Sequence, residues 1–190
     1  MTTVLLFHHA HGRTTGFLGF ADELRRAGHE VYTPDLYDGR TFDDLDEGVA
    51  YAGQVGFGEI VRRGTEAAQG LPSDIVYAGF SLGVLPAQSL AQTRPGARGA
   101  LLFHACVPTS EFGGPWPDGV PLQIHMMDAD PWGEEDLPAA RALASETASA
   151  ELFLYPGSGH LFADPSLDAY DERAAGLLME RTLAFLRRVR

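Results

Sequence analysis

The chain has a single cysteine among its 190 residues, which excludes an internal disulfide bond. That residue, Cys106, closely follows a short apolar run, a position more typical of a small buried thiol than of a catalytic one. The sequence also lacks any apolar stretch near the roughly 20 residues that cross a bilayer. The apolar segment at residues 4–7 is too short for a signal peptide and has no basic flank. These absences favour a cytoplasmic protein.

Basic residues are scarce as well. The chain has 14 of them, all arginine, against 26 acidic residues, which gives a formal net charge of −12. Negative charge of this size repels the phosphates of nucleic acids and of anionic membranes, so we expect neither as a partner. Repeats, low-complexity tracts and linkers are absent too, and the composition is ordinary for a globular protein. We therefore predict one domain, residues 1–190.

Six short apolar runs recur along the chain, and helical patterns separate most of them. Near-continuous apolar character is typical of parallel strands that are covered on both faces. We therefore predict an α/β fold in which helices flank a mainly parallel sheet of about six strands. The predicted strands are residues 4–7, 30–33, 74–78, 100–104, 121–127 and 151–155, and the main predicted helices are residues 17–27, 58–69, 84–92 and 167–189.

The pentapeptide GFSLG at residues 79–83 has the form G-x-S-x-G and lies between an apolar run and a helical pattern. Strand, tight turn and helix are the context in which a nucleophile elbow works. The turn strains the backbone of the serine, and the flanking glycines let strand and helix approach closely. The hydroxyl then stands at the carboxyl edge of the sheet, near the positive end of the helix. The motif therefore predicts Ser81 as a nucleophile.

A serine hydroxyl needs a neighbouring base, and that base needs a carboxylate to hold its tautomer. Asp130 and His160 follow the last two predicted strands, so all three residues lie beyond carboxyl strand ends, where ligands bind in open α/β sheets. Their order, serine then acid then histidine, is that of α/β-hydrolases. Asp128 is the alternative acid. The alternative to an enzyme is a non-catalytic small-ligand binding protein on the same fold.

Two irregular stretches lie beyond strand ends. Residues 38–54 are acidic and are expected to include a short helix. Residues 107–120 contain Phe112 and Trp116, which either pack within their loop or form a pocket wall.

Three histidines near the start, His8, His9 and His11, could in principle bind a metal. Alternate residues on a strand point to opposite faces, and no Asp or Glu cluster lies nearby in sequence. We therefore expect no metal site.

Over nearly its whole length the chain resembles the dienelactone hydrolase family of α/β-hydrolases. Residues 4–12 (VLLFHHAHG) look like the first core strand and oxyanion loop of that family, and residues 34–37 (PDLY) are similar to another of its segments. Residues 125–131, which include Asp130, and residues 159–163 (GHLFA) match segments of that family in order and spacing. Residues 180–186 resemble the final helix.

The resemblance implies an α/β-hydrolase fold, here without a cap domain, and a hydrolase that needs neither metal nor organic cofactor. It aligns Asp130 with the catalytic acid. We expect Ser81 to attack a small carboxylic ester, lactone or thioester and form an acyl-enzyme, with His160 as base. The backbone N–H groups of Ala10 and Leu82 would hold the oxyanion.

The departures from the family pattern bear on the substrate. The best-known members have cysteine where Ser81 stands. Members that hydrolyse dienelactone have glutamate in place of His9 and, in place of Asp164, an arginine that holds the substrate carboxylate. We expect Asp164 near the pocket mouth, where it would repel such a carboxylate, so dienelactone itself is not expected as substrate. The expected substrate contacts are His9, Tyr37, Phe112, Trp116 and Asp164.

Overall fold

The computed structural model describes residues 1–189 and contains one sheet of six strands. The strands lie in the order β2-β1-β3-β4-β5-β6, and every neighbouring pair is parallel. The six predicted strands are therefore confirmed as members of one parallel sheet. Their bounds are Thr3–Phe7 (β1), Glu30–Tyr32 (β2), Val76–Phe80 (β3), Gly99–Phe103 (β4), Leu122–Met127 (β5) and Ala150–Tyr155 (β6).

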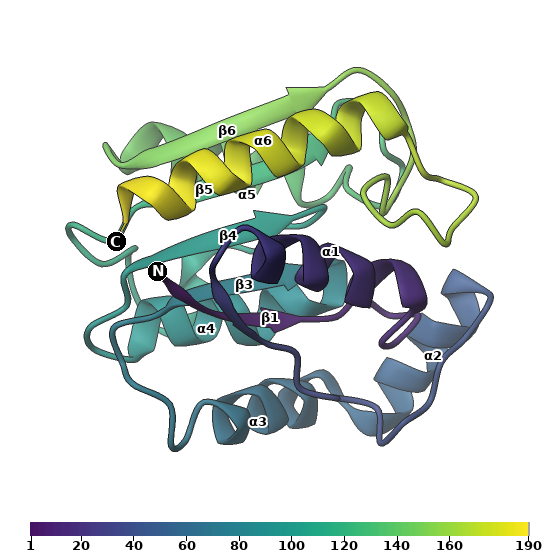
Figure 1. Ribbon diagram of the computed structural model, residues 1–190, viewed down its shortest axis with the longest axis horizontal. Coiled ribbons are helices and arrows are strands. Elements are labelled where there is room, and N and C mark those ends of the chain that lie inside the picture. The colour runs from purple at the N-terminus through teal and green to yellow at the C-terminus, as the bar shows by residue number, and fades with distance from the viewer. Residues whose placement is uncertain (190) are drawn as a thin grey trace.

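Helices cover both faces of the sheet (Figure 1). Helices α1 and α6 enclose one apolar cluster with the strands, and α2, α3, α4 and α5 contribute to a second cluster on the other face. Successive side chains of β1 point to opposite faces, so Val4 packs in the first cluster and Leu5 in the second. The helix bounds are Thr15–Arg26 (α1), Leu45–Val55 (α2), Phe57–Ala67 (α3), Val84–Thr93 (α4), Leu137–Glu146 (α5) and Glu172–Arg188 (α6).

Two helices begin where an aspartate caps them. The Asp44 carboxylate accepts the N–H of Glu47 at 3.0 Å and starts α2, which is the short helix expected in the acidic stretch. The tail helix α6 begins at Glu172 rather than at Leu167, because Asp171 caps it by accepting the N–H of Ala174 at 2.9 Å. The residues just before Asp171 form turns instead of the predicted first helical turns.

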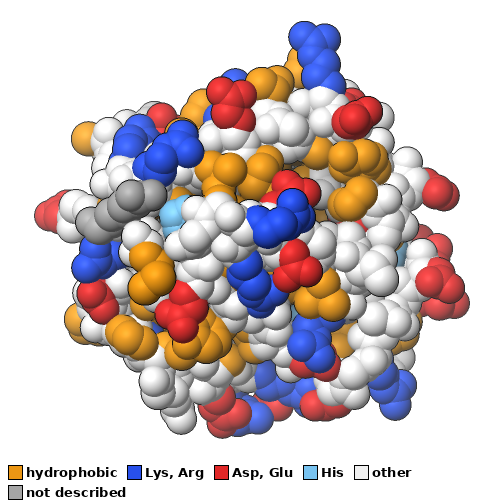
Figure 2. All heavy atoms as spheres, viewed as in Figure 1, with side chains coloured by type: hydrophobic (Ala, Val, Ile, Leu, Met, Phe, Trp, Pro, Cys, Tyr) orange, Lys and Arg blue, Asp and Glu red, His pale blue; other side chains and the backbone are white. Residues whose placement is uncertain are grey.

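Residues 1–189 form this sheet and its flanking helices, and they include no separate cap domain. Figure 2 shows acidic, basic and apolar side chains interspersed over the face that carries α1 and α6. Within the described residues, no helix has both the length and the apolar character needed to cross a bilayer.

Candidate active site

The tight turn after β3 holds Ser81 in a strained conformation. Its φ is 48°, in the left-handed region that residues other than glycine rarely adopt. The two flanking glycines allow this turn. A Cβ on Gly79 would lie 2.1 Å from the carbonyl oxygen of Gly83, and a Cβ on Gly83 would lie 2.4 Å from that of Phe7. Any larger side chain at either position would push α4 away from the sheet.

The structure brings Ser81, His160 and Asp130 together. The Ser81 Oγ lies 2.8 Å from His160 Nε2, and His160 Nδ1 lies 2.6 Å from Asp130 Oδ2. The other Asp130 oxygen accepts the N–H of Trp132 at 2.9 Å, which fixes the carboxylate. With Nδ1–H donating to Asp130, the lone pair of Nε2 faces the serine hydroxyl. This is the arrangement that general-base activation of a serine requires.

The alternative acid, Asp128, lies elsewhere. It is exposed, and its Oδ1 accepts the N–H of Gly157 at 3.1 Å, so it supports the loop after β6. The structure therefore places Asp130, and not Asp128, against His160.

Two pockets meet at these residues. The smaller, of about 210 Å³, is lined by Ser81 together with Leu82 and Ala10, the two expected oxyanion donors. The larger, of about 850 Å³, is lined by His160 and by polar residues that include Arg13. The small pocket is bounded by α2 and α4, and a Cβ on Gly48 of α2 would lie 2.2 Å from the carbonyl oxygen of Ala10. Helix α2 thus packs directly on the expected oxyanion loop.

Sequence reasoning missed most residues of these walls, and Trp132 and Asp136 are the two of them that bear on the chemistry. Trp132 lines both pockets, and its ring centroid lies 6.1 Å from that of His160. Asp136 is half-buried in the small pocket and accepts the N–H of Cys106 at 3.3 Å. Burial raises the pKa of Asp136. The sequence did contain a signal for Trp132, because a large aromatic residue two positions after the predicted acid Asp130 is placed to line the pocket.

The early histidines make structural hydrogen bonds. His8 Nδ1 lies 2.7 Å from the carbonyl oxygen of His9, and the Leu36 N–H donates to His8 Nε2 at 3.0 Å. Burial lowers the pKa of His8 to about 4, which keeps Nε2 free to accept. His11 Nδ1 lies 2.8 Å from the carbonyl oxygen of Phe42. Residues 1–189 hold no group of three or more His, Cys, Asp or Glu side chains placed to bind a metal.

Asp164 does not lie at the pocket mouth, so this expectation was wrong. Its side chain is buried, and its carboxylate accepts hydrogen bonds from His9 Nε2 at 2.7 Å and from the Thr14 hydroxyl at 2.5 Å. The N–H and hydroxyl of Ser166 also donate to it, at 2.8 and 2.6 Å. Burial opposes ionisation, but the hydrogen bonds from His9, Ser166 and Thr14 outweigh it and hold the pKa of Asp164 well below its usual range.

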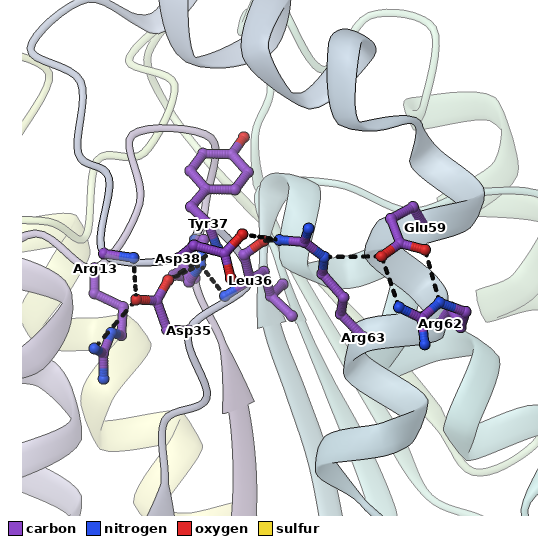
Figure 3. A network of polar contacts seen from close by, with 10 residues as sticks. Arg13, Asp35, Leu36, Tyr37, Asp38, Glu59, Arg62 and Arg63 are labelled. Atoms are coloured by element: carbon purple, nitrogen blue, oxygen red, sulfur yellow. Dashed lines mark hydrogen bonds and ion pairs between the residues drawn. The ribbon is translucent and has the colours of Figure 1, made fainter.

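The segment after β2 is held by a polar network (Figure 3). Asp35 accepts the N–H of Tyr37 at 2.8 Å and pairs with Arg13 at 3.3 Å. From α3, Arg63 donates to the carbonyl of Leu36 at 2.8 Å. The network anchors this loop to its neighbours on both sides.

The aromatic residues expected to contact substrate do not line the two pockets. Tyr37 is buried and donates its hydroxyl proton to the carbonyl of Gly48 at 3.0 Å, and Trp116 is buried with its Nε1–H donating to Val120 at 2.8 Å. The described residues that line the pockets of Ser81 and His160 include none of the four expected contacts Tyr37, Trp116, Phe112 and His9. For Trp116 the structure therefore favours packing within the loop, and Phe112 lines neither pocket.

Comparisons with known proteins agree with this fold. The family model for the dienelactone hydrolase family matches residues 1–190. No curated protein matches the chain. Among solved structures, a dienelactone hydrolase-like promiscuous phosphotriesterase from metagenomic libraries is 17% identical with a TM-score of 0.75, over 100% of this chain and 87% of that one.

Two esterases are also similar in structure. The apo form of Thermogutta terrifontis esterase 2 is 17% identical with a TM-score of 0.72, over 99% of this chain and 83% of that one. Esterase PE8 is 16% identical with a TM-score of 0.65, over 100% of this chain and 93% of that one. Since the family model spans the whole chain, this protein belongs to the dienelactone hydrolase family and is a hydrolase of ester bonds.

Proposed function

We propose that this protein is a serine hydrolase that cleaves a small carboxylic ester, lactone or thioester through an acyl-enzyme. One observation carries the proposal, the continuous hydrogen-bonded series from Ser81 Oγ to His160 Nε2 (2.8 Å) and from His160 Nδ1 to Asp130 Oδ2 (2.6 Å). It is supported by the strained elbow, which directs the hydroxyl outward from the sheet edge.

In the first step, Ser81 Oγ attacks the carbonyl carbon while His160 Nε2 takes the hydroxyl proton. Asp130 holds the Nδ1–H tautomer and stabilises the imidazolium that forms. The carbonyl oxygen becomes an oxyanion, which the N–H groups of Ala10 and Leu82 receive. Each such donor contributes on the order of 10²–10³ in kcat.

The imidazolium then gives its proton to the leaving oxygen or sulfur, so the leaving group must lie on the His160 side. That side opens into the larger pocket, which His160 lines. The acyl group lies on the other side, in the small pocket that Ser81 lines. Water, activated by His160, next attacks the acyl-enzyme, releases the acid and restores the serine hydroxyl.

A fluorophosphonate probe tests this proposal. We expect stoichiometric labelling of Ser81 in the folded protein, no labelling of a Ser81→Ala variant, and loss of 4-nitrophenyl ester hydrolysis in parallel with labelling. A folded wild-type protein that stays unlabelled and cleaves no ester would favour a non-catalytic binding protein.

A further inference from the structure

The small pocket beside Ser81 contains one ionisable group. Val49 and Ala52 of α2, Val84 and Leu85 of α4 and several other apolar side chains form most of its wall. Within the described residues, Asp136 is the only lining residue whose side chain can carry a charge. A carboxylate in such surroundings is costly unless it is paired or hydrogen-bonded.

The protein itself does little to balance this carboxylate. Its Oδ2 accepts the N–H of Cys106 at 3.3 Å, and no ion pair between Asp136 and a cationic side chain occurs in residues 1–189. Although Asp136 precedes α5, its side chain makes no capping hydrogen bond there. Its pKa is raised first by burial, and Glu135 and Asp130 add to the rise, while His160 and the Cys106 hydrogen bond oppose it. Capping and ion pairing therefore do not explain this acid.

The position of Asp136 relates it to the acyl part of a substrate. The leaving group must face His160 to receive a proton, and His160 lines the larger pocket. Asp136 lines the pocket on the Ser81 side, which the acyl group enters. Trp132 and Phe57 line the same pocket, and aromatic faces attract cations.

We propose that this pocket binds an acyl group that carries a protonated amine, with the ammonium on Asp136. The proposal rests on the proposed function and narrows its substrate class to esters, lactones or thioesters of short amino acids. An acyl group that ends in a carboxylate is disfavoured, because it would meet the like charge of the half-buried Asp136 in a largely apolar pocket. Charge selection thus falls to Asp136 rather than to Asp164.

Three 4-nitrophenyl esters of similar size test the proposal at pH 7. They are the butyrate, the 3-aminopropanoate, in which an ammonium replaces the terminal methyl, and the anionic succinate half-ester, with spontaneous hydrolysis subtracted. We expect wild type to prefer the amino ester over the butyrate by about 10-fold in kcat/KM, the effect of one charge-assisted hydrogen bond. The succinate half-ester should be the poorest substrate.

Asp136→Asn should abolish the preference for the amino ester and improve the succinate ester relative to the butyrate, both judged as ratios of kcat/KM within the one variant. Glu135→Gln is the matched control, since it removes the same charge from an exposed neighbour outside the pocket lining. It should keep the wild-type ratios. Circular dichroism and the thermal midpoint report whether each variant is folded.

The two proposals fail in distinguishable ways. If wild type cleaves butyrate and aminopropanoate equally well, or if Asp136→Asn keeps the wild-type ratio, the amine site is wrong and the serine hydrolase stands. If wild type cleaves none of the three esters and no fluorophosphonate labels Ser81, the proposed function fails and the amine site fails with it.

Discussion

Ser81 illustrates how single residues set up the chemistry. A φ of 48° costs a residue with a side chain on the order of 1–3 kcal/mol, and the surrounding packing must compensate for this strain. The compensation comes from α4, which lies close to the strands only because Gly79 and Gly83 lack side chains. The strained serine and its two flanking glycines all lie within the G-x-S-x-G pattern of residues 79–83, so the sequence alone could predict the turn.

Replacing Ser81 by alanine removes the proposed nucleophile and little else. We expect Ser81→Ala to lose ester hydrolysis by on the order of 10⁴-fold or more, because only the oxyanion donors and binding remain. Circular dichroism and the thermal midpoint should stay close to those of wild type. Wild-type turnover by the purified, folded variant would contradict the mechanism.

The choice of acid can be tested with a matched pair of substitutions. Asp130→Asn keeps the shape of the side chain but favours the wrong imidazole tautomer, so kcat should fall by roughly 10⁴-fold. Asp128→Asn, two residues earlier and exposed, should change kcat little. Steady-state kinetics that reverse this ranking would move the acid to Asp128.

The sequence predicted which residues lie near the sheet edge better than where their side chains point. Strand ends bring Asp130 and His160 beside Ser81, and this follows from the order of the strands. The inward direction of Asp164 depends on the turn after His160, in which Leu161 has a φ of 61°, and no local pattern encodes that turn. The place of Trp132 in both pocket walls was not predicted either.

Between elements, the buried Asp164 carboxylate joins three segments. It accepts hydrogen bonds from His9 in the loop after β1, from Thr14 at the start of α1, and from Ser166 in the loop after β6. Thr14 in turn caps α1 by accepting the N–H of Phe17 at 3.1 Å. The expected oxyanion loop and the loop that carries His160 are thus tied through one side chain.

Removing that side chain should loosen all three segments. Asp164→Ala leaves the buried His9 ring and the half-buried Thr14 hydroxyl without their acceptor, and we expect a loss of about 3–5 kcal/mol in the free energy of unfolding. Asp168→Ala, an exposed aspartate on the same loop, is the control and should cost little. Urea unfolding at pH 7 measures both, and equal midpoints for the two variants would contradict the assigned role of Asp164.

For the whole molecule, buried histidines connect stability to pH. Burial lowers the pKa of His8 to about 4 and that of His125 to about 3, and it also lowers the pKa values of His9 and His104. In the unfolded chain each imidazole titrates near its ordinary value of about 6.5. Between these pH values the unfolded state binds more protons, so the stabilisation is complete above about pH 6.5 and is lost as the pH falls toward 4.

The loss should be measurable by urea unfolding at pH 7, 6 and 5. His8 and His125 alone predict a decrease of roughly 4 kcal/mol in the free energy of unfolding from pH 7 to pH 5, about 2 kcal/mol each. The net charge of −12 predicts the opposite trend, because acid relieves the repulsion among carboxylates. Stability that rises toward pH 5 would therefore contradict the role of the histidines, and His125→Gln should flatten the dependence.

The most direct test of the mechanism is to trap the acyl group on the enzyme. Wild type is mixed with 4-nitrophenyl acetate, quenched in acid within the first turnovers, digested and analysed by mass spectrometry. We predict an initial burst of nitrophenol and an acetyl group on the hydroxyl of Ser81, with neither in Ser81→Ala. Turnover without an adduct on the Ser81 peptide, or an adduct on another residue that carries the activity, would contradict the assignment of Ser81 as nucleophile.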